Sequence, residues 1–586
     1  MKNKYIIVLL TIALSLTGCE GYLDRTPLDK NSDATNWTSE SSLETFSWKL
    51  YNTFDGYGSG WSRGQYLSNG LTDDYCPDGY SYPTQNIPSS SSAWSDPYSW
   101  IRRANILLDR VDQIPDLSDE EANHWRGVAR FFRGKEHFNL VRTYGDVVWI
   151  DTEVNIDDTV TLSRARDPRV DVMKNVCADL QFAAENCKYT TDNTVNNMCA
   201  DALLARAALY EGAWQKYHEN NTENAIYFYT IAKNAANDII NSGHYSIHTD
   251  YLSNYISKDL TGNTEMILYK VYCYTGEGAK VTCAHAMQGW CNSSSKTWGL
   301  TKSAVESFAN SNGLPIYMGT YSDATIQDVF ENRDERLSEI ASPTILCPVG
   351  WAYEEGINSS TGYWTDKFVD WSDYGTITWS APYNTTDAPI FSYSEVLENY
   401  AEACAELEDL GEGSMSQADL DKSVNIVREK HGNLPPLKYE GAGSVSVNGT
   451  VITKDPKNTV GVSNLLWELR RERRSELMCD GFRHDDLMRW KMGSFIDFSK
   501  NPECYEGASK SAITAYYNAT KDNDLYKDKK YSDIENGNFW NGDGEYMSAF
   551  NLEENNRVFD EVKNYLEPIP SGQITLNPNL KQNPGW

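Results

Sequence analysis

Helical periodicity is the feature of this sequence that most restricts its fold. Apolar side chains recur three or four positions apart in six segments of the first half of the chain: 40–55, 99–113, 119–143, 167–186, 197–217 and 222–241. This spacing puts them on one face of a helix, and that face must be buried against a neighbour. Segment 197–217 is also rich in Ala, whose small side chain lets two helices approach closely. The pattern predicts a mainly α scaffold of packed helices.

The second half of the chain has a mixed pattern. Residues 243–385 contain short β-rich pieces such as 266–272, separated by Gly, Asn and Ser clusters. Helical periodicity returns in three segments, 392–410, 416–431 and 462–478, and the chain is loop-rich after about residue 495. Binding residues often lie on loops that a rigid frame supports. We therefore expect an irregular, partly β face carried by the helices.

The first residues have the composition of a secretory signal peptide. Lys2 and Lys4 precede an apolar run, 5–16, which is too short to span a membrane. Residues 16–19, Leu-Thr-Gly-Cys, resemble the lipobox of bacterial lipoproteins. We expect cleavage after residue 18 and lipid on Cys19, which would anchor the mature chain to a membrane. The alternative is an ordinary cleaved signal that happens to precede a cysteine.

The charge of the chain argues against nucleic acid as a partner. The sequence has 52 Lys and Arg against 83 Asp and Glu, a net charge of −31, and removal of residues 1–18 would leave −33. Phosphate binding needs clustered cations. The Arg-rich string at 470–474 is interrupted by Glu472, and we interpret it as a set of ion pairs that tie a helix to its neighbours.

The cysteines and histidines predict neither a metal site nor a cofactor. The twelve cysteines form no CxxC motif, and the eight histidines form no HExxH motif. His244 and His248 are four positions apart but follow Gly243 in an expected loop. Most cysteines are expected to be buried thiols, and Cys283 and Cys291 are candidates for a pair within one loop.

Several longer motifs follow one known pattern. They are Tyr22-Leu23-Asp24 with Pro27, residues 125–147, the Ala-rich segment 202–210, residues 388–403, the block 472–490 and the ending 566–586. Together they resemble the SusD/RagB family, the surface glycan-binding lipoproteins of Bacteroidetes. Ser392 stands where that family usually has Arg.

The resemblance implies a fold, a location and a function. It implies one SusD-like domain, 19–586, with an N-terminal part at about 19–240 and a RagB/SusD part at about 241–586. Tetratricopeptide-like helix pairs would support the ligand face. The protein would be anchored in the outer membrane through Cys19, bind oligosaccharides without catalysis, and deliver them to a SusC-like, TonB-dependent transporter.

Aromatic side chains are the expected ligand contacts. Sugar rings present apolar faces rimmed by hydroxyls, so a glycan site needs exposed aromatic rings beside polar groups. Two loop regions offer them, and the candidate ligand-binding residues are Trp61, Tyr66, Asp73, Tyr75, Trp94, Trp290, Trp298, Trp351 and Trp371. For each ring, packing in the core is the alternative.

Two other functions remain open from the sequence. A glycoside hydrolase would need two carboxylates at a defined separation. The adjacent pairs Asp73–Asp74, Glu354–Glu355 and Asp485–Asp486 are available, but we interpret them as solvated surface groups. A protein of the same fold that binds peptides, siderophores or another nutrient is the second alternative.

Overall fold

The computed structural model describes residues 37–66, 70–76, 83–276, 283–292, 298–342, 359–521, 544–548 and 557–586. The expected signal peptide, Cys19, Trp351 and Glu354–Glu355 lie outside these ranges. Among the helices of the described ranges, none combines the length and the apolar composition needed to cross a bilayer.

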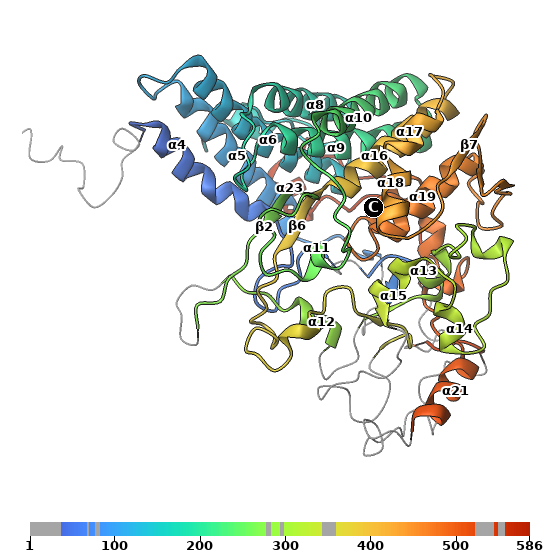
Figure 1. The fold of residues 1–586 in the computed structure, drawn as a ribbon. Helices are drawn as coiled ribbons and strands as arrows, with labels where there is room; N and C mark the ends of the chain where they lie inside the picture. Colours follow the sequence, from blue (N-terminus) through green and yellow to red (C-terminus); the bar gives the residue numbers. More distant parts are fainter. Residues whose placement is uncertain are drawn as a thin grey trace, which may run out of the picture.

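A layer of long helices forms the upper part of the molecule in Figure 1. Its members are α4 (Glu40–Ser47), the 3-10 helix η1 (Trp48–Thr53), α5 (Ser92–Val111), α6 (Asp119–Tyr144), α8 (Arg169–Asn186), α9 (Asn197–Tyr217), α10 (Thr222–Ser242) and α16 (Tyr393–Asp409). Consecutive helices from α5 to α10 pack against each other, apart from the short α7 (Thr159–Leu162), and α16 packs on α10. This layer confirms the helical prediction.

Local sequence signals explain where these helices begin and how closely they pack. Ser118 starts α6 with a capping box, in which its hydroxyl accepts from the backbone N–H of Glu121 and the Glu121 carboxylate accepts in return. Gly212 lets α9 approach α10, because a Cβ there would lie 2.8 Å from the Tyr229 ring. The expected helix at 40–55 is divided into α4 and η1, and α5 begins seven residues before the predicted residue 99.

In the described ranges, three small antiparallel sheets lie outside the helical layer. The first pairs β2 (Met266–Lys270) with β6 (Ala388–Ser392). The second has the order β1-β3-β5-β4 and contains Tyr75–Cys76, Gly299–Leu300, Trp364–Thr365 and Ala341–Ser342. The third is formed by β7 (Lys438–Gly441), β8 (Ser444–Val447) and β9 (Thr450–Val451).

The remaining described helices lie between the strands or follow the last of them. They are α11 (Ser253–Ile256), α12 (Met287–Asn292), α13 (Lys302–Ser307), α14 (Ile326–Phe330), α15 (Glu335–Ile340), α17 (Gln417–Asp421), α18 (Val424–Lys430), α19 (Asn464–Glu476), α20 (Arg483–Arg489), α21 (Lys510–Thr520) and α23 (Ser571–Leu576), with 3-10 turns η2 (Ile316–Met318), η3 (Trp371–Asp373), η4 (Gly493–Ile496) and η5 (Pro502–Cys504). Helix α21 is a departure from the loop-rich ending expected after residue 495.

Residues from both halves of the sequence share the main hydrophobic core. Phe131 and Phe132 of α6 lie in it with Phe391 of β6 and Leu466 of α19. A second, separate cluster is rich in Tyr and includes Tyr57, Tyr66 and Phe368. The division of the chain near residue 240 stays a prediction.

Buried ion pairs connect α19 to its neighbours, as the sequence predicts. Arg473 donates to Asp486, and Arg474 donates to Asp74. Glu472 accepts from Arg336 of α15 and from Arg428 of α18. The partners belong to different segments of the chain, so the pairs join elements that are distant in sequence.

Candidate functional site

Main-chain hydrogen bonds bring three loops together in the lower part of the molecule. The amide of Gly60 donates to the carbonyl of Ala284 at 2.9 Å. The amides of His285 and Asn384 each donate to the carbonyl of the other, both at 3.0 Å. Residues 57–66, 283–290 and 371–384 therefore lie side by side.

Two buried polar side chains hold these loops. The His285 ring accepts from the amide of Met287 through Nδ1 and donates to the carbonyl of Thr386 through Nε2, at 3.1 and 3.0 Å. Burial lowers the pKa of His285 to about 4, so the ring is neutral. Asn384 accepts from the amide of Gln288 and donates to the carbonyl of Trp379. Both residues therefore act as supports.

Aromatic rings gather on this support. Trp61 is 53% exposed and meets the half-buried Trp290 edge to face, with ring centroids 5.6 Å apart. The Arg63 guanidinium lies 4.1 Å from the Trp290 ring centroid and 3.9 Å from that of Trp298. Trp298 in turn stacks on Tyr75 at 5.2 Å.

A second group of rings comes from the 371–384 loop. The ring centroid of Trp379 lies 5.2 Å from that of Trp371 and 5.3 Å from that of Tyr374. The Tyr374 side chain is 45% exposed. The indole N–H of Trp371 donates to Asp366 at 2.8 Å, and burial raises the pKa of this carboxyl to about 6.

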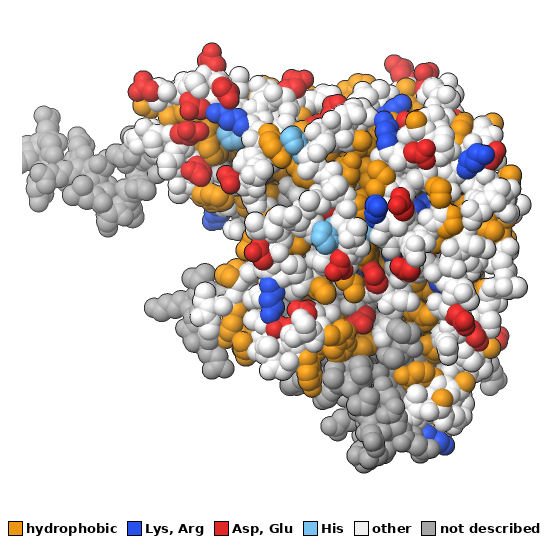
Figure 2. All heavy atoms as spheres, in the orientation of Figure 1, with side chains coloured by type: hydrophobic (Ala, Val, Ile, Leu, Met, Phe, Trp, Pro, Cys, Tyr) orange, Lys and Arg blue, Asp and Glu red, His pale blue; other side chains and the backbone are white. Residues whose placement is uncertain are grey.

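Gly289 joins the two groups of rings. A Cβ on Gly289 would lie 2.4 Å from the Cβ of Ala381 and 3.6 Å from the Trp61 ring, so α12 touches both neighbouring loops. We define the aromatic face as Trp61, Trp290, Trp371 and Tyr374; Trp379 is only 4% exposed and packs against Trp371 and Tyr374 as part of the support. Figure 2 shows hydrophobic side chains at the surface around α12, in the same lower part of the view.

Three buried donors beside the aromatic face have no acceptor. In the described part of the chain, they are Nε1 of Trp290, Nε1 of Trp298 and Nε2 of Gln288. Buried polar groups are almost always hydrogen-bonded to protein, water or a ligand. These donors therefore mark a place where water or a ligand would be stabilised.

Five of the candidate residues from the sequence meet here, and three others lie elsewhere. Trp61, Tyr75, Trp290, Trp298 and Trp371 take part in the ring contacts above, but Tyr75 and Trp298 are only 2% and 5% exposed and pack in the core beside the aromatic face. Tyr66 is buried and donates to the carbonyl of Pro389. Trp94 is only 5% exposed and packs in the helical core, 5.0 Å from Tyr144. The third is Asp73. The sequence analysis did not select Arg63, Tyr374 or Asp366, although Arg63 follows Trp61 in a Gly-rich loop.

For Asp73 and Asp74, the interpretation as solvated surface groups is wrong, whereas Glu354–Glu355 lies outside the described residues. Asp73 and Asp74 are fully buried and lie between Arg474 and Arg483. Burial opposes ionisation of Asp73, but both guanidiniums outweigh it and hold its pKa well below its usual value. Two facing Arg side chains explain why these carboxylates are stable inside the protein.

The pair Asp485–Asp486 is also held by arginines. Asp485 accepts from Arg142, and Asp486 accepts from Arg473 and Arg489. Both carboxylates therefore belong to the scaffold, like those at 73 and 74. Neither pair presents an acid and a base to the aromatic face.

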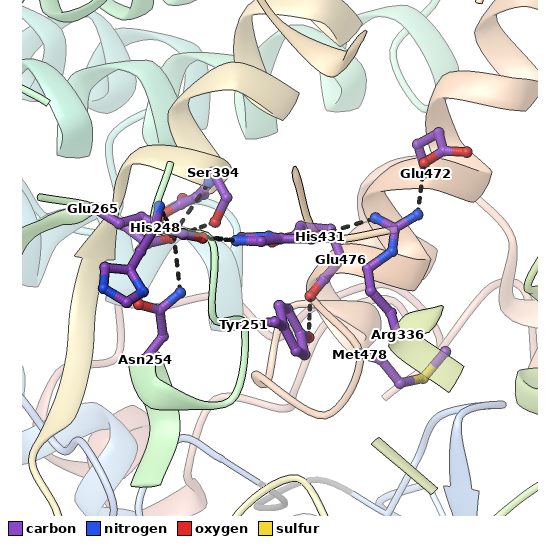
Figure 3. A network of polar contacts seen from close by, with 12 residues as sticks. His248, Tyr251, Asn254, Glu265, Arg336, Ser394, His431, Glu472, Glu476 and Met478 are labelled. Carbon is purple, nitrogen blue, oxygen red and sulfur yellow. Dashed lines mark hydrogen bonds and ion pairs between the residues drawn. The ribbon is translucent and has the colours of Figure 1, made fainter. Parts of the chain in front are cut away.

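A buried cluster of Glu265, His431 and Glu476 was not anticipated from the sequence (Figure 3). Its three ligand-type atoms lie within 4.8 Å of one another, as in a metal site. However, both ring nitrogens of His431 donate, Nδ1 to Glu476 and Nε2 to the carbonyl of His248, each at 2.8 Å. A doubly protonated ring cannot bind a metal ion.

The charges around His431 explain its protonation. Burial opposes the charged ring, but Glu476 and Glu265 outweigh this effect and raise the pKa of His431 well above its usual value. Glu265 also accepts from Asn254, and Glu476 from Arg336 (Figure 3). The cluster is an internal ion-pair network between distant segments.

A cavity of about 600 Å³ lies apart from the aromatic face, between α13, α19 and η5. Trp467 and Phe495 form part of its wall. Its charged groups already take part in ion pairs, as in Lys457–Glu503, Arg471–Asp455 and Arg470–Glu406. A ligand would have to break these pairs, so we place the candidate site on the aromatic face.

Two family models match this chain. The model described as "SusD family" covers residues 352–586, and the model described as "Starch-binding associating with outer membrane" covers residues 66–233. The chain belongs to the SusD/RagB family. A SusD-like protein of Bacteroides ovatus is 26% identical over 296 residues, which are 47% of this chain and 51% of that relative. The match thus spans about half the length of this curated relative.

Solved structures establish the SusD fold. A SusD-like carbohydrate-binding protein from Bacteroides fragilis superposes with a TM-score of 0.67 at 18% identity, covering 93% of this chain and 100% of that one. Surface glycan-binding protein A from Bacteroides fluxus gives 0.59 at 15% identity, covering 94% and 100%. The predicted mainly α SusD-like fold, with small antiparallel sheets, is confirmed.

Proposed function

We propose that this SusD-family protein binds neutral oligosaccharides at the cell surface through its aromatic face. The observation that carries this proposal is the convergence of Trp61, Trp290, Trp371 and Tyr374 from three segments on one hydrogen-bonded support, which includes the buried Trp379. Rings of this kind offer the flat apolar surfaces that stack on sugars. The relatives described as carbohydrate- or glycan-binding support the same assignment.

Charge favours a neutral ligand over an acidic one. A mature chain of net charge −33 repels polyanions at long range. The Arg63 guanidinium lies over the rings of Trp290 and Trp298. Binding then depends on stacking and on hydrogen bonds to hydroxyls. We expect modest affinity, roughly micromolar to millimolar, because ordering a flexible glycan opposes binding.

The protein acts without catalysis in this proposal. A retaining or inverting glycosidase needs two carboxylates placed about 5–10 Å apart around the bond to be cleaved. The adjacent pairs at 73–74 and 485–486 are engaged by Arg side chains. Incubation with the bound oligosaccharide should return it unchanged by mass spectrometry.

A glycan array followed by calorimetry on residues 20–586 tests the binding. Trp61→Ala and Trp371→Ala should each weaken binding of the selected oligosaccharide at least several-fold. Trp48→Ala is the matched control, because Trp48 is 49% exposed but belongs to η1 and contacts Tyr51. Normal binding by both site variants would exclude the aromatic face. Saturable binding of peptides in place of glycans would favour the alternative function, a protein of the same fold that binds peptides.

The location and partner complete the proposal. We propose lipid on Cys19, outer-membrane anchoring, and transfer of the glycan to a SusC-like, TonB-dependent transporter. The family model described as associating with the outer membrane supports the location. Cys19→Ala should release the protein or leave it unprocessed. Purification of the native protein in mild detergent should recover a large barrel protein, and recovery of the protein alone would contradict the partnership.

A further inference from the structure

Two cysteines meet at the surface beside the aromatic face. Cys273 follows β2, and Cys283 precedes the loop that holds His285. Their Sγ atoms are 2.8 Å apart, closer than the about 3.5–4.0 Å at which nonbonded carbon atoms pack. The Cys283 amide donates to the Cys273 carbonyl at 3.3 Å, so the two backbones also run side by side.

These two thiols differ from the other described cysteines in their access to solvent. Cys273 is exposed and Cys283 is partly exposed, whereas the other eight cysteines of the described ranges are buried. Cys291, the partner considered from the sequence for Cys283, is buried in α12, and its carbonyl accepts from the Trp364 indole. An oxidant in solution can therefore reach Cys273 and Cys283 directly.

We propose that Cys273 and Cys283 form a disulfide in the mature protein. This inference rests on the proposed location outside the cytoplasm, where disulfides persist. The two thiols give up two protons and two electrons to the disulfide of an extracytoplasmic thiol–disulfide exchange protein, which is reduced to a dithiol. One Sγ–Sγ bond forms here while one breaks in the oxidant.

The disulfide would crosslink two segments that support the aromatic face. It joins the end of β2 to the segment that leads into His285 and α12, which carries Trp290. Tyr272, next to Cys273, already packs on the His285 ring with centroids 4.6 Å apart. Because a crosslink restricts the unfolded chain, it stabilises this junction.

Tryptic mapping of the mature protein, isolated from its native membrane without reductant, tests the proposal. Trypsin cuts after Lys270, Lys280 and Lys296, which separates peptide 271–280 from peptide 281–296. We expect these two peptides to appear linked, at their summed mass less two hydrogens, and to separate on reduction. After denaturation, Cys291 in the second peptide should be alkylated without reductant.

Two results would overturn the proposal: alkylation of Cys273 and Cys283 without reduction, or peptide 281–296 alone and two hydrogens lighter, which would indicate a Cys283–Cys291 bond. Cys273→Ser is the control and should leave Cys283 free to be alkylated. If the native link is absent, oxidised glutathione added to the purified chain distinguishes the causes: a link formed then points to the location, and no link points to the geometry. Glycan binding is measured separately, so failure of the proposed function does not change the peptide masses.

Discussion

Arg483 donates two hydrogen bonds to Asp73, at 2.7 and 2.9 Å, across a separation of 410 residues. Both side chains are buried, and Arg474 lies against the same carboxylate. The N-terminal loop that continues into β1 is thereby tied to the start of α20. The relationship explains why an acidic pair near the expected ligand loop belongs to the scaffold.

Removal of this carboxylate should destabilise the fold. Asp73→Asn leaves two Arg side chains facing Asp74 alone, and breaking a buried pair costs about 3–5 kcal/mol of the free energy of unfolding. Urea unfolding followed by tryptophan fluorescence measures the loss. Arg102→Gln is the control, because Arg102 is 51% exposed in its pair with Glu153 and should cost about 0–1 kcal/mol.

The unfolding free energy that Asp73→Asn loses should become smaller as the pH falls. The folded-state pKa of Asp73 is lowered, so its contribution to stability is present above its unfolded pKa of about 3.9 and is lost as pH falls. The difference between the wild type and Asp73→Asn should therefore shrink below about pH 4. An equal difference at pH 3 and pH 7 would contradict the ion-pair assignment.

Trp94 and Trp61 should respond in opposite ways to truncation. Trp94→Ala opens a cavity in the helical core and should lower the free energy of unfolding by about 3–5 kcal/mol. Trp61→Ala removes an exposed ring and should change stability by less than about 1 kcal/mol while it weakens glycan binding. Differential scanning calorimetry and binding calorimetry separate the two effects. Weakened binding by a fully stable Trp94→Ala protein would contradict this placement.

His431 should stabilise the protein most strongly at neutral and acidic pH. Its folded-state pKa is raised, so its contribution is complete below the unfolded pKa of about 6.5 and is lost as pH rises through the folded-state pKa. The difference in unfolding free energy between wild type and His431→Gln should be about 3–5 kcal/mol at pH 6 and smaller in alkaline solution. The exposed His244 gives the control variant His244→Gln, which should be nearly neutral.

Chelators should not change the stability that the Glu265–His431–Glu476 cluster provides. Both nitrogens of the His431 ring donate to oxygen atoms and leave no lone pair for a metal ion. The unfolding temperature should therefore be equal with and without EDTA. A fall on chelation that His431→Gln abolishes would show that the cluster binds a metal.

Asp366 should limit stability at alkaline pH. Burial raises the pKa of this carboxyl to about 6, so its contribution is complete below its unfolded pKa of about 3.9 and is lost as pH rises through 6. Asp366→Asn cannot ionise and keeps an oxygen that accepts from the Trp371 indole. The variant should be about 1–3 kcal/mol more stable than wild type at pH 8 and close to it near pH 4. Lower stability at both values would show that the carboxylate itself is required.

Local patterns were sufficient to predict the helical scaffold. The three- and four-residue spacing in segments 197–217 and 222–241 predicted α9 and α10, because each helix must bury its own apolar face. The Glu472–Glu476 segment also predicted ion pairing, since alternating opposite charges on one helix need partners. Its partners Arg336, Arg428 and His431 lie outside that segment, and local sequence carries no signal for contacts of this range.

The sequence by itself determined the fold family, the helical layer and the loops in which aromatic rings are concentrated. The tertiary structure decided which of these rings share a surface. Trp61 and Trp94 have the same side chain and lie in Ser-containing stretches, yet one is exposed beside Trp290 and the other packs on Tyr144. The reason is physical: periodicity reports the burial of a residue within its own element, whereas exposure in a loop depends on which distant segments pack over it.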